Sequence, residues 1–363
     1  MLSASSILKS DNNSRHPAKA VHTYSEKQWR SLGIEMVKLS GASEEQAAVI
    51  TDVLISGSLR GIDSHGVRIL PYFTDKREMG EMKVTKETKA TAMLDAANVW
   101  GPASAVRAMR IAMDKAADTG LGCCSITNGD WITNLFYYSA MALERDMIGM
   151  VFVRDNVCCS PWGGTVPVTG TDPMSIAIPA GEANPIVLDF ATTIVAQGHV
   201  RTFLLEGKPL PEGWLIDRKG DSVHGNVLNL QNIDDFWERG GSLLPFGTYK
   251  GYALNVAIGV LGGALNLTGT GSRGKGQGVT VFAVDVGAFV PVEEFKQEID
   301  RLVKEVKSTP VRPGFKEVLL PGELEYRSMA LRRKEGIPVD DKSWTALLQT
   351  CEKNGIDAMS YLD

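Results

Sequence analysis

Residues 265–286 read LNLTGTGSRGKGQGVTVFAVDV, and the order of elements predicted around this stretch decides the fold class. Its segment 269–274, GTGSRG, matches the pattern G-x-G-x-x-G. In dinucleotide-binding folds a strand precedes these glycines and a helix follows them, so that a pyrophosphate meets the helix N-terminus. Here an apolar helical run, 249–266, precedes the glycines and a strand pattern, 279–286, follows them. We therefore predict a glycine-rich loop at 269–274, and any nucleotide site has to be built in another way.

The sequence around this loop predicts a mixed sheet with helices between its strands, in an α/β (α+β) fold. Short apolar or alternating runs bounded by Gly, Pro, Asn or Asp are typical of strands. They occur at 123–127, 148–153, 174–179, 185–190 and 279–286. Helices are predicted at 102–118, 134–146 and 249–266.

Both ends of the chain predict further helices. Ser25 with Gln28 and Ser43 with Gln46 form capping boxes, and apolar positions follow each of them at helical spacing. Another amphipathic helix is predicted after Pro291. The chain has 363 residues, more than a single hydrophobic core usually supports, which favours two lobes.

Composition excludes several classes of partner. The net charge of −5 provides no basic surface for phosphate backbones, so we expect no nucleic acid partner. The longest apolar run, 251–265, contains Asn255 and is shorter than the ~20 residues of a membrane-spanning helix, so we expect no membrane contact. Five cysteines without metal-ligand or redox-motif spacing indicate reduced thiols, a cytoplasmic location and no metal site. The Ser-rich start, 1–20, is compatible with a transit peptide or a disordered tail.

The segment 60–68, RGIDSHGVR, places an acid, a hydroxyl, an imidazole and two guanidinium groups directly after a predicted helix. An imidazole titrates near neutral pH, so His65 is the natural proton donor or acceptor if it faces a cleft. From the local sequence alone, a structural histidine remains an alternative.

Two later segments add polar groups near the predicted sheet. Asp172 and Asp189 stand at the ends of successive predicted strands. Lys250 falls in the first turn of a predicted helix, where the macrodipole disfavours a cation. This position indicates an anionic partner, such as phosphate or carboxylate, although a solvated lysine fits the sequence equally well.

Five separated blocks together resemble one family, the second type of malate/L-lactate dehydrogenase, which includes ureidoglycolate dehydrogenase, sulfolactate dehydrogenase, diketogulonate reductase and the Δ1-piperideine-2-carboxylate reductases. In order along the chain, the blocks are GIDSHGVRILPY (61–72), GTDPMSIAIP (170–179), PIVLDFATTIVAQG (185–198), LPFGTYKGYAL (244–254) and LLPGELE (319–325).

The resemblance implies a non-Rossmann oxidoreductase with NADH or NADPH as cofactor, and a homodimer with its active site near the interface. The central, largely antiparallel sheet domain would bind the cofactor, and a helical domain built from both chain ends would bind substrate and form the dimer. On this chain these parts are a disordered tail at 1–22, a helical domain at 23–98 and 288–363, and a sheet domain at 99–287.

The resemblance also implies roles for individual residues. His65 would donate a proton to the substrate carbonyl or imine, Ser64 would be its hydrogen-bonding neighbour, and Asp189 would orient it or relay protons. Arg68 would hold a substrate carboxylate, because a planar guanidinium suits bidentate recognition, and Tyr72 would lie on the substrate side. The residues expected near the cofactor are Asp155, Asp172, Phe190, Ala191, Thr192, Lys250, Pro321, Gly322 and Glu323. An acid at Asp155 would favour NADH by repelling a 2′-phosphate.

One block departs from the family. Many relatives carry a second histidine in a segment N-S-x-H-F-G, where this chain has Asp130 and Trp131, with Thr133 in place of the glycine. His65 would then carry the proton alone, or Asp130 would substitute, while Trp131 would form a flat apolar wall of the substrate site. We expect reduction or oxidation of an atypical small 2-oxo or 2-hydroxy carboxylate. The alternatives are a cyclic imino acid (ketimine) reductase, since a protonated imine needs less acid assistance, and a repurposed member without redox activity.

Overall fold

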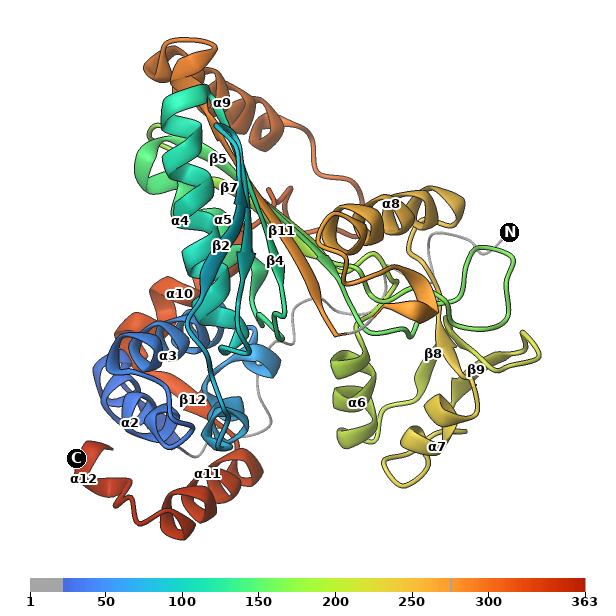
Figure 1. Cartoon of the computed structure of the whole chain (residues 1–363). Helices are drawn as coiled ribbons and strands as arrows, with labels where there is room; N and C mark the ends of the chain where they lie inside the picture. The colour runs from blue at the N-terminus through green and yellow to red at the C-terminus, as the bar shows by residue number, and fades with distance from the viewer. Residues whose placement is uncertain (1–21, 275, 363) are drawn as a thin grey trace. The chain divides into compact units, whose positions relative to one another are not determined.

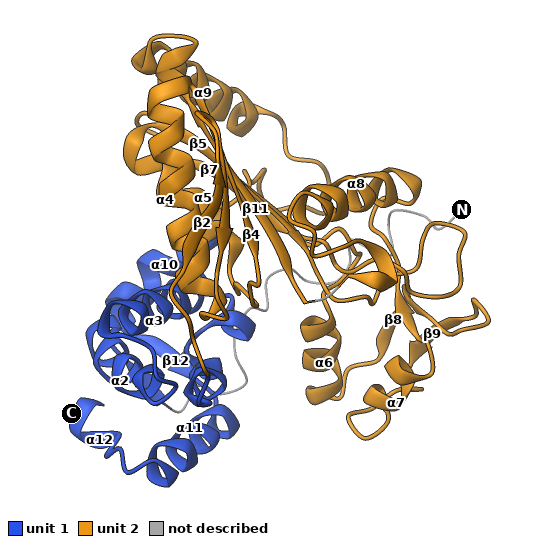
Figure 2. Cartoon of the chain, viewed as in Figure 1, with its two compact units in different colours: residues 1–77, 324–363 blue, residues 78–323 orange. Residues whose placement is uncertain are grey.

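The computed structural model describes residues 22–274 and 276–362, so the predicted N-terminal tail lies outside the described residues except for His22. The chain divides into two compact units (Figures 1 and 2). Unit 1 comprises residues 1–77 and 324–363, and unit 2 comprises residues 78–323. The domain bounds expected from the sequence assign residues 78–98 and 288–323 to the helical domain. The structure groups both segments with the sheet.

Unit 1 is mainly helical, and a two-stranded antiparallel sheet joins its two segments. Strand β1 (His22–Tyr24) pairs with β12 (Ile337–Val339). Both predicted capping boxes are present, at the starts of α2 (Glu26–Lys38) and α3 (Glu44–Leu59). The other elements are the 3₁₀ helices η1 (Asp63–His65) and η2 (Val67–Thr74) and the helices α10 (Glu323–Glu335), α11 (Asp341–Lys353) and α12 (Met359–Leu362).

Unit 2 is built on a seven-stranded mixed sheet that is mostly antiparallel. The order is β2-β3-β4-β11-β5-β6-β7, and β3 with β4 is the parallel pair among the described strands. The strands are β2 (Lys83–Glu87), β3 (Thr91–Asp95), β4 (Leu121–Thr127), β5 (Met147–Arg154), β6 (Met174–Ile178), β7 (Ile186–Phe190) and β11 (Gly278–Asp285).

Helices cover both faces of this sheet (Figure 1). On one face, α4 (Gly101–Thr119) and α5 (Leu135–Met141) pack closely because the strands beneath carry a row of small residues. A Cβ atom at Gly122 would lie 1.8 Å from a carbonyl oxygen of α4, and one at Gly149 would lie 2.1 Å from a carbonyl oxygen of α5. On the other face, α8 (Tyr249–Gly259) continues into a π-helical turn, η4 (Val260–Ala264), whose Leu261 carbonyl accepts a hydrogen bond from Thr280 Oγ1 over 2.7 Å.

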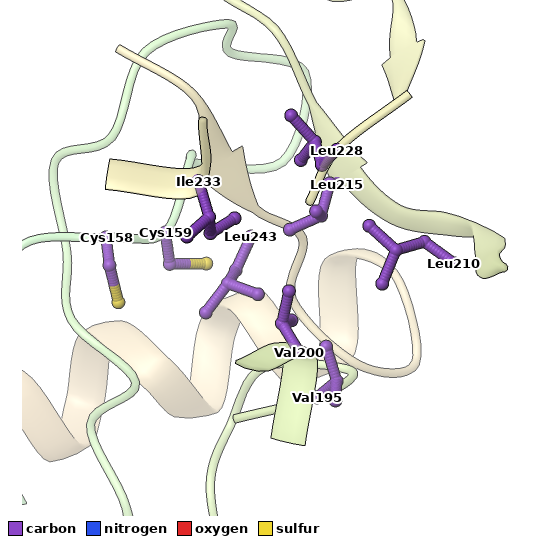
Figure 3. Close-up of a cluster of buried hydrophobic side chains, with 9 residues drawn as sticks. All are labelled: Cys158, Cys159, Val195, Val200, Leu210, Leu215, Leu228, Ile233 and Leu243. Carbon is purple, nitrogen blue, oxygen red and sulfur yellow. The ribbon is translucent and has the colours of Figure 1, made fainter. Parts of the chain in front are cut away.

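A smaller sheet within unit 2 has its own hydrophobic core (Figure 3). Its order is β10-β8-β9, and the adjacent pair Cys158 and Cys159 is buried in this core, as packing of the pair predicts. Burial raises the pKa of the Cys159 thiol to about 12, so it is a neutral packing group. The remaining elements of unit 2 are β8 (Leu210–Ile216), β9 (Ser222–Gly225), β10 (Ser242–Leu243), α6 (Gln197–Leu205), α7 (Ile233–Glu238), α9 (Val292–Ser308), and the 3₁₀ turns η3 (Ala142–Arg145), η5 (Gly271–Arg273) and η6 (Val286–Ala288).

The five strands predicted from apolar runs are present as β4, β5, β6, β7 and β11, and the glycine-rich segment forms a loop with the short turn η5 between a helix and a strand. The sequence did not predict β2, because every residue of β2 is exposed and its polar pattern KVTKE lacks strand alternation. Strand β3 was also missed, although burial alternates along it. Among the described residues, we find no helix that combines the length and the apolar character needed to cross a membrane.

Candidate functional site

Most of the predicted site residues of unit 2 lie at one end of the seven-stranded sheet. Because β4 and β5 both run antiparallel to β11, and β5, β6 and β7 alternate in direction, the carboxyl ends of β4, β5 and β7 meet the amino ends of β6 and β11. We call this end of the sheet the site end. Its loops carry Asp130, Trp131, Asp155, Asp172, Ala191 and Thr192, and the last two residues of β7, Asp189 and Phe190, lie there as well.

Gln277, just before β11, connects two of these loops. Its side-chain nitrogen donates to the Asp155 carboxylate over 2.9 Å, and its side-chain oxygen accepts from the Ile132 backbone N–H over 3.2 Å. Asp155 also accepts a hydrogen bond from Thr171 Oγ1 over 2.7 Å. The Asp155 carboxylate and the Gln277 side chain together therefore connect the segments that follow β4 and β5 and precede β6 and β11.

Asp172 is an interior residue of the site end. It is 1% exposed and has a φ of 34°, in the region that favours glycine. Burial raises the pKa of its carboxyl to about 7, although the hydrogen bond that it accepts from the Asp155 backbone N–H, over 2.9 Å, acts in the opposite direction. Its buried carboxylate shapes the loop from inside rather than presenting a charge at the surface.

Thr192 is also interior, while the two residues before it are more accessible. Its hydroxyl donates to the Thr171 carbonyl over 2.8 Å and accepts from Asn255 Nδ2 over 2.8 Å. Asn255 Oδ1 is buried and has no hydrogen-bond partner among the described residues. Phe190 is 38% exposed and Ala191 is half-buried, so the exposed surface at this point belongs to these two residues.

Asp189 joins β7 to the start of α5. Its Oδ2 accepts a hydrogen bond from the Phe136 backbone N–H, in the first turn of that helix, over 2.8 Å. A carboxylate here satisfies a helix N-terminal donor and is favoured by the helix dipole. Asp189 therefore has a structural role in unit 2, whatever chemistry it performs.

The loop between β4 and α5 is strained. Asp130 and Trp131 are half-buried, and a Cβ atom at Gly101, the first residue of α4, would lie 2.2 Å from the Trp131 carbonyl oxygen. Thr133 has a φ of 63°, and its buried hydroxyl has no hydrogen-bond partner among the described residues. A β-branched residue is a genuine outlier in this region, and such strain concentrates at functional sites.

Lys250 lies beside the site end, at the start of α8. The Phe246 backbone N–H donates to the Thr192 carbonyl over 3.0 Å, which fixes the segment leading into the helix. The N-cap residue, Thr248, has a φ of 61° and makes no capping hydrogen bond with its side chain, and Lys250 is exposed. An exposed cation next to uncapped backbone N–H groups has the chemistry of an anion-binding site.

The turn Pro321–Gly322–Glu323 lies along the edge strand β7. Its Pro321 carbonyl accepts from the Val187 backbone N–H over 3.3 Å, and Gly322 has a φ of 88°. The Glu323 carboxylate pairs with Lys307 at 2.8 Å. The turn thus covers part of the sheet edge, and its carboxylate already has a cationic partner.

The predicted residues of unit 1 lie on two successive 3₁₀ helices. Ser64 Oγ and His65 Nδ1 are 2.8 Å apart, so a hydrogen bond joins the hydroxyl to the ring. Arg68 is half-buried and Tyr72 is 44% exposed, both on η2. His65 is half-buried, so its ring is not part of the hydrocarbon core.

Sequence reasoning missed several residues that build the site. Gln277 and Asn255 have no local signature, because their partners are far away in the sequence. Thr248 has a positive φ, which neither its residue type nor the preceding Gly247 indicates. Arg332 contacts Asp63 in unit 1, and the separation of 269 positions in the sequence hides this pair from any local pattern.

Comparisons with known proteins agree with this architecture. The family model for malate/L-lactate dehydrogenase matches residues 24–348. A malate/(S)-sulfolactate dehydrogenase of Methanothermus fervidus is 33% identical over 345 residues, which cover 90% of this chain and 97% of that protein. The solved sulfolactate dehydrogenase of Methanocaldococcus jannaschii superposes with a TM-score of 0.84 at 29% identity, covering 94% of this chain and all of that one.

A third comparison, at lower identity, concerns the fold alone. The Δ1-piperideine-2-carboxylate reductase of Pseudomonas syringae pv. tomato superposes with a TM-score of 0.77 at 24% identity, covering 91% of this chain and 99% of that one. The family model spans most of the sequence, and the relatives match over nearly their whole lengths. The chain therefore belongs to the malate/L-lactate dehydrogenase family and is an enzyme of the dehydrogenase class.

Proposed function

We propose that this enzyme transfers a hydride between NADH or NADPH and a small 2-oxo or 2-hydroxy carboxylate of atypical structure. The observation that carries the proposal is the site end of unit 2, where polar loops converge and four non-glycine residues, Asn128, Thr133, Asp172 and Thr248, have positive φ. Residues in such conformations persist where function requires them. Relatives named for malate and sulfolactate support a small carboxylate substrate.

The cofactor is proposed to bind at the site end, on a sheet that is not a Rossmann sheet. The uncapped N-terminus of α8 and the exposed Lys250 fit the negative phosphates of a dinucleotide. Phe190 and Ala191 offer accessible apolar surface at the site end. When bound, the nicotinamide supplies or accepts the hydride, and the protein contributes orientation and electrostatics.

Residues of η1 and η2 are proposed to handle the proton and the carboxylate. His65 donates a proton to the substrate oxygen or nitrogen, and its hydrogen bond to Ser64 restricts the orientation of the ring. Arg68 holds the substrate carboxylate through two parallel hydrogen bonds, with Tyr72 beside it. Asp189 is assigned the orientation of His65 as part of this proposal, in addition to its hydrogen bond with Phe136.

A second candidate, reduction of a cyclic imino acid, is favoured by one observation. The loop after β4 carries Trp131 where the resemblance to the family leads us to expect a second histidine, and this loop contains no imidazole. A general acid contributes roughly 10²–10⁴ in rate, which a ketone substrate needs more than a protonated imine does. The third alternative, a repurposed family member without redox activity, predicts that neither NADH nor NADPH binds.

The test is a panel of 2-oxo and cyclic 2-imino acids with each cofactor, applied to the native protein, to His65→Ala and to a control, His224→Ala, which alters an exposed histidine on β9. We expect turnover to fall by about 10²-fold or more in His65→Ala alone. Equal turnover in all three proteins would remove His65 from the mechanism. Absence of binding of both cofactors, measured by tryptophan fluorescence, would favour the non-redox alternative.

We also propose that two copies pair through the outer surface of α8 and η4. Residues 251–272 contain no charged residue, and the surface exposes Val256, Val260, Leu265 and Leu267, the last of which is 91% exposed. A second copy presents the same neutral apolar surface, so pairing buries apolar area without repulsion between like charges.

Light scattering at micromolar concentration tests the pairing. We expect a dimer for the native chain, a monomer for Val260→Asp, and a dimer for the control Val227→Asp, whose exposed apolar side chain lies elsewhere in unit 2. A monomeric native protein would contradict the proposal.

A further inference from the structure

Helix α10, from the C-terminal end of the sequence, contacts the end of α3 and the residues just after it. Ser328 Oγ donates to the Leu59 carbonyl over 3.0 Å, and the Arg60 guanidinium lies 4.9 Å from the centre of the Tyr326 ring. The last carbonyl groups of a helix have no partner within that helix. Side chains of α10 thus provide partners where α3 ends.

Arg332 makes the most extensive of these contacts. Its side chain is buried, with the residue 8% exposed, and its Nη2 donates to Asp63 Oδ2 over 3.0 Å. The Nη1 atom donates to Asp63 Oδ1 and to the Ser58 carbonyl, each over 2.5 Å. One guanidinium therefore binds a carboxylate with both nitrogens and adds a hydrogen bond to the Ser58 carbonyl, which also accepts from the Gly61 N–H over 3.0 Å. Lysine cannot reproduce this geometry.

Asp63 is the first residue of the 3₁₀ turn that carries His65. Its backbone carbonyl accepts from the Gly66 N–H over 3.2 Å, which closes the turn around the histidine. On the other side, Ser58 Oγ accepts from the Val67 N–H over 2.9 Å. A Cβ atom at Gly66 would lie 2.1 Å from that hydroxyl oxygen, so the turn has no room to shift towards α3.

We propose that Arg332 is a positioning residue for His65, which acts by fixing Asp63 and the end of α3 and thereby sets the direction of the imidazole. This inference rests on the proposed role of His65 as the proton donor. Arg332 itself is not assigned any contact with substrate. Arg333, the next residue along α10, provides a matched control. It is largely exposed, and its ion pair with Glu26 is long, at 3.8 Å.

The first measurement compares turnover in Arg332→Gln, Arg332→Lys and Arg333→Gln. Small displacements of a catalytic group cost up to about 10²-fold, so we expect kcat to fall by roughly this factor in Arg332→Gln, with a smaller change in KM. Arg332→Lys retains the charge but loses the two-nitrogen contact and should recover only part of kcat. Arg333→Gln should retain native kcat. In a His65→Ala background, Arg332→Gln should cause no further loss, because both changes disable the same group.

The second measurement does not depend on turnover. The imidazole ¹⁵N resonances of His65, assigned by their loss in His65→Ala, should shift or broaden in Arg332→Gln and in Asp63→Asn but not in Arg333→Gln. If the native protein lacks redox activity and these resonances still respond, the proposed function fails and the positioning role stands. If turnover is present but Arg332→Gln leaves both kcat and the resonances unchanged, or lowers kcat equally in the His65→Ala background, the positioning role is overturned.

Discussion

The guanidinium of Arg154 lies directly against Gly274, so that a Cβ atom added to this glycine would stand 2.2 Å from Arg154 Cζ. Arg154 is 2% exposed and donates to the carbonyls of Gly271 and Gly276 over 2.8 and 2.6 Å. The last glycine of the G-x-G-x-x-G match is thus explained by packing of the loop on a buried arginine.

We therefore expect Gly274→Ala to displace Arg154 and destabilise the loop by about 1–3 kcal/mol, as overpacking does. Thermal unfolding and the rate of proteolysis within the loop would measure the effect. Gly198→Ala is the control, because a Cβ atom at Gly198 would have nothing within 4 Å and this residue stands in the first turn of α6. It should be neutral or slightly stabilising, and similar losses in both variants would contradict the packing argument.

Thr133→Gly should stabilise the protein, by about 1 kcal/mol, because it removes left-handed strain at a β-branched residue and a buried hydroxyl without a partner among the described residues. Thr345→Gly, inside α11, should instead destabilise it, by about 0.3–0.5 kcal/mol. Urea denaturation distinguishes the two signs. A loss of stability in Thr133→Gly would show that favourable packing of the threonine side chain outweighs its strain.

Asp172 makes the stability depend on pH. Burial raises the pKa of its carboxyl from 3.8 to about 7, so the folded state binds more protons between these values and stability falls as the pH rises through this window. Asp172→Asn should be more stable than the native protein above about pH 7, by at most about 4 kcal/mol, and this difference should shrink as the pH falls towards 4. Thermal unfolding of both proteins across this range provides the measurement, and a difference independent of pH would refute the prediction.

Asp300 makes the stability depend on pH in the opposite direction. Its carboxylate accepts hydrogen bonds from the backbone N–H groups of Gly181, Glu182 and Ala183 at 2.8–3.1 Å, and the bonds from Glu182 and Ala183 lower its pKa. The stabilisation is present above the pKa of the unfolded chain and is lost as the pH falls through the lower folded-state value. Asp300→Ala should lower the melting temperature at neutral pH, with less effect in acid, whereas Glu298→Gln, on the exposed side of α9, should change it little.

Trp131→His should place an imidazole in the loop where the resemblance to the family leads us to expect a second histidine. If its absence limits reduction of 2-oxo acids, kcat for such a substrate should rise by about 10²-fold or more, with a smaller change for a cyclic imine. Trp162→His, at an exposed tryptophan of unit 2, is the matched control. No gain in kcat with either substrate class would indicate that Asp130 or His65 alone suffices as the proton donor.

The sequence was informative wherever the signal was local. Ser25 and Ser43 cap the helices that their capping boxes predict, and the apolar runs before Thr127 and Arg154 form strands. Strand β2 was missed because its side chains are exposed on both faces. In the site, the hydrogen bond between Ser64 and His65 joins adjacent residues, whereas Gln277 and Arg332 act through partners more than one hundred positions away, which no local pattern encodes.

Unit 1 is discontinuous in the sequence, and this imposes an order on biosynthesis. Residues 78–323, with both sheets of unit 2, are synthesised before β12. Residues 324–363 then take roughly 2 to 8 seconds to translate at rates of about 5–20 residues per second. During that interval the nascent chain carries α2 and α3 without the strand and helices that complete them, so its histidine-bearing segment is among the last parts of the enzyme to mature.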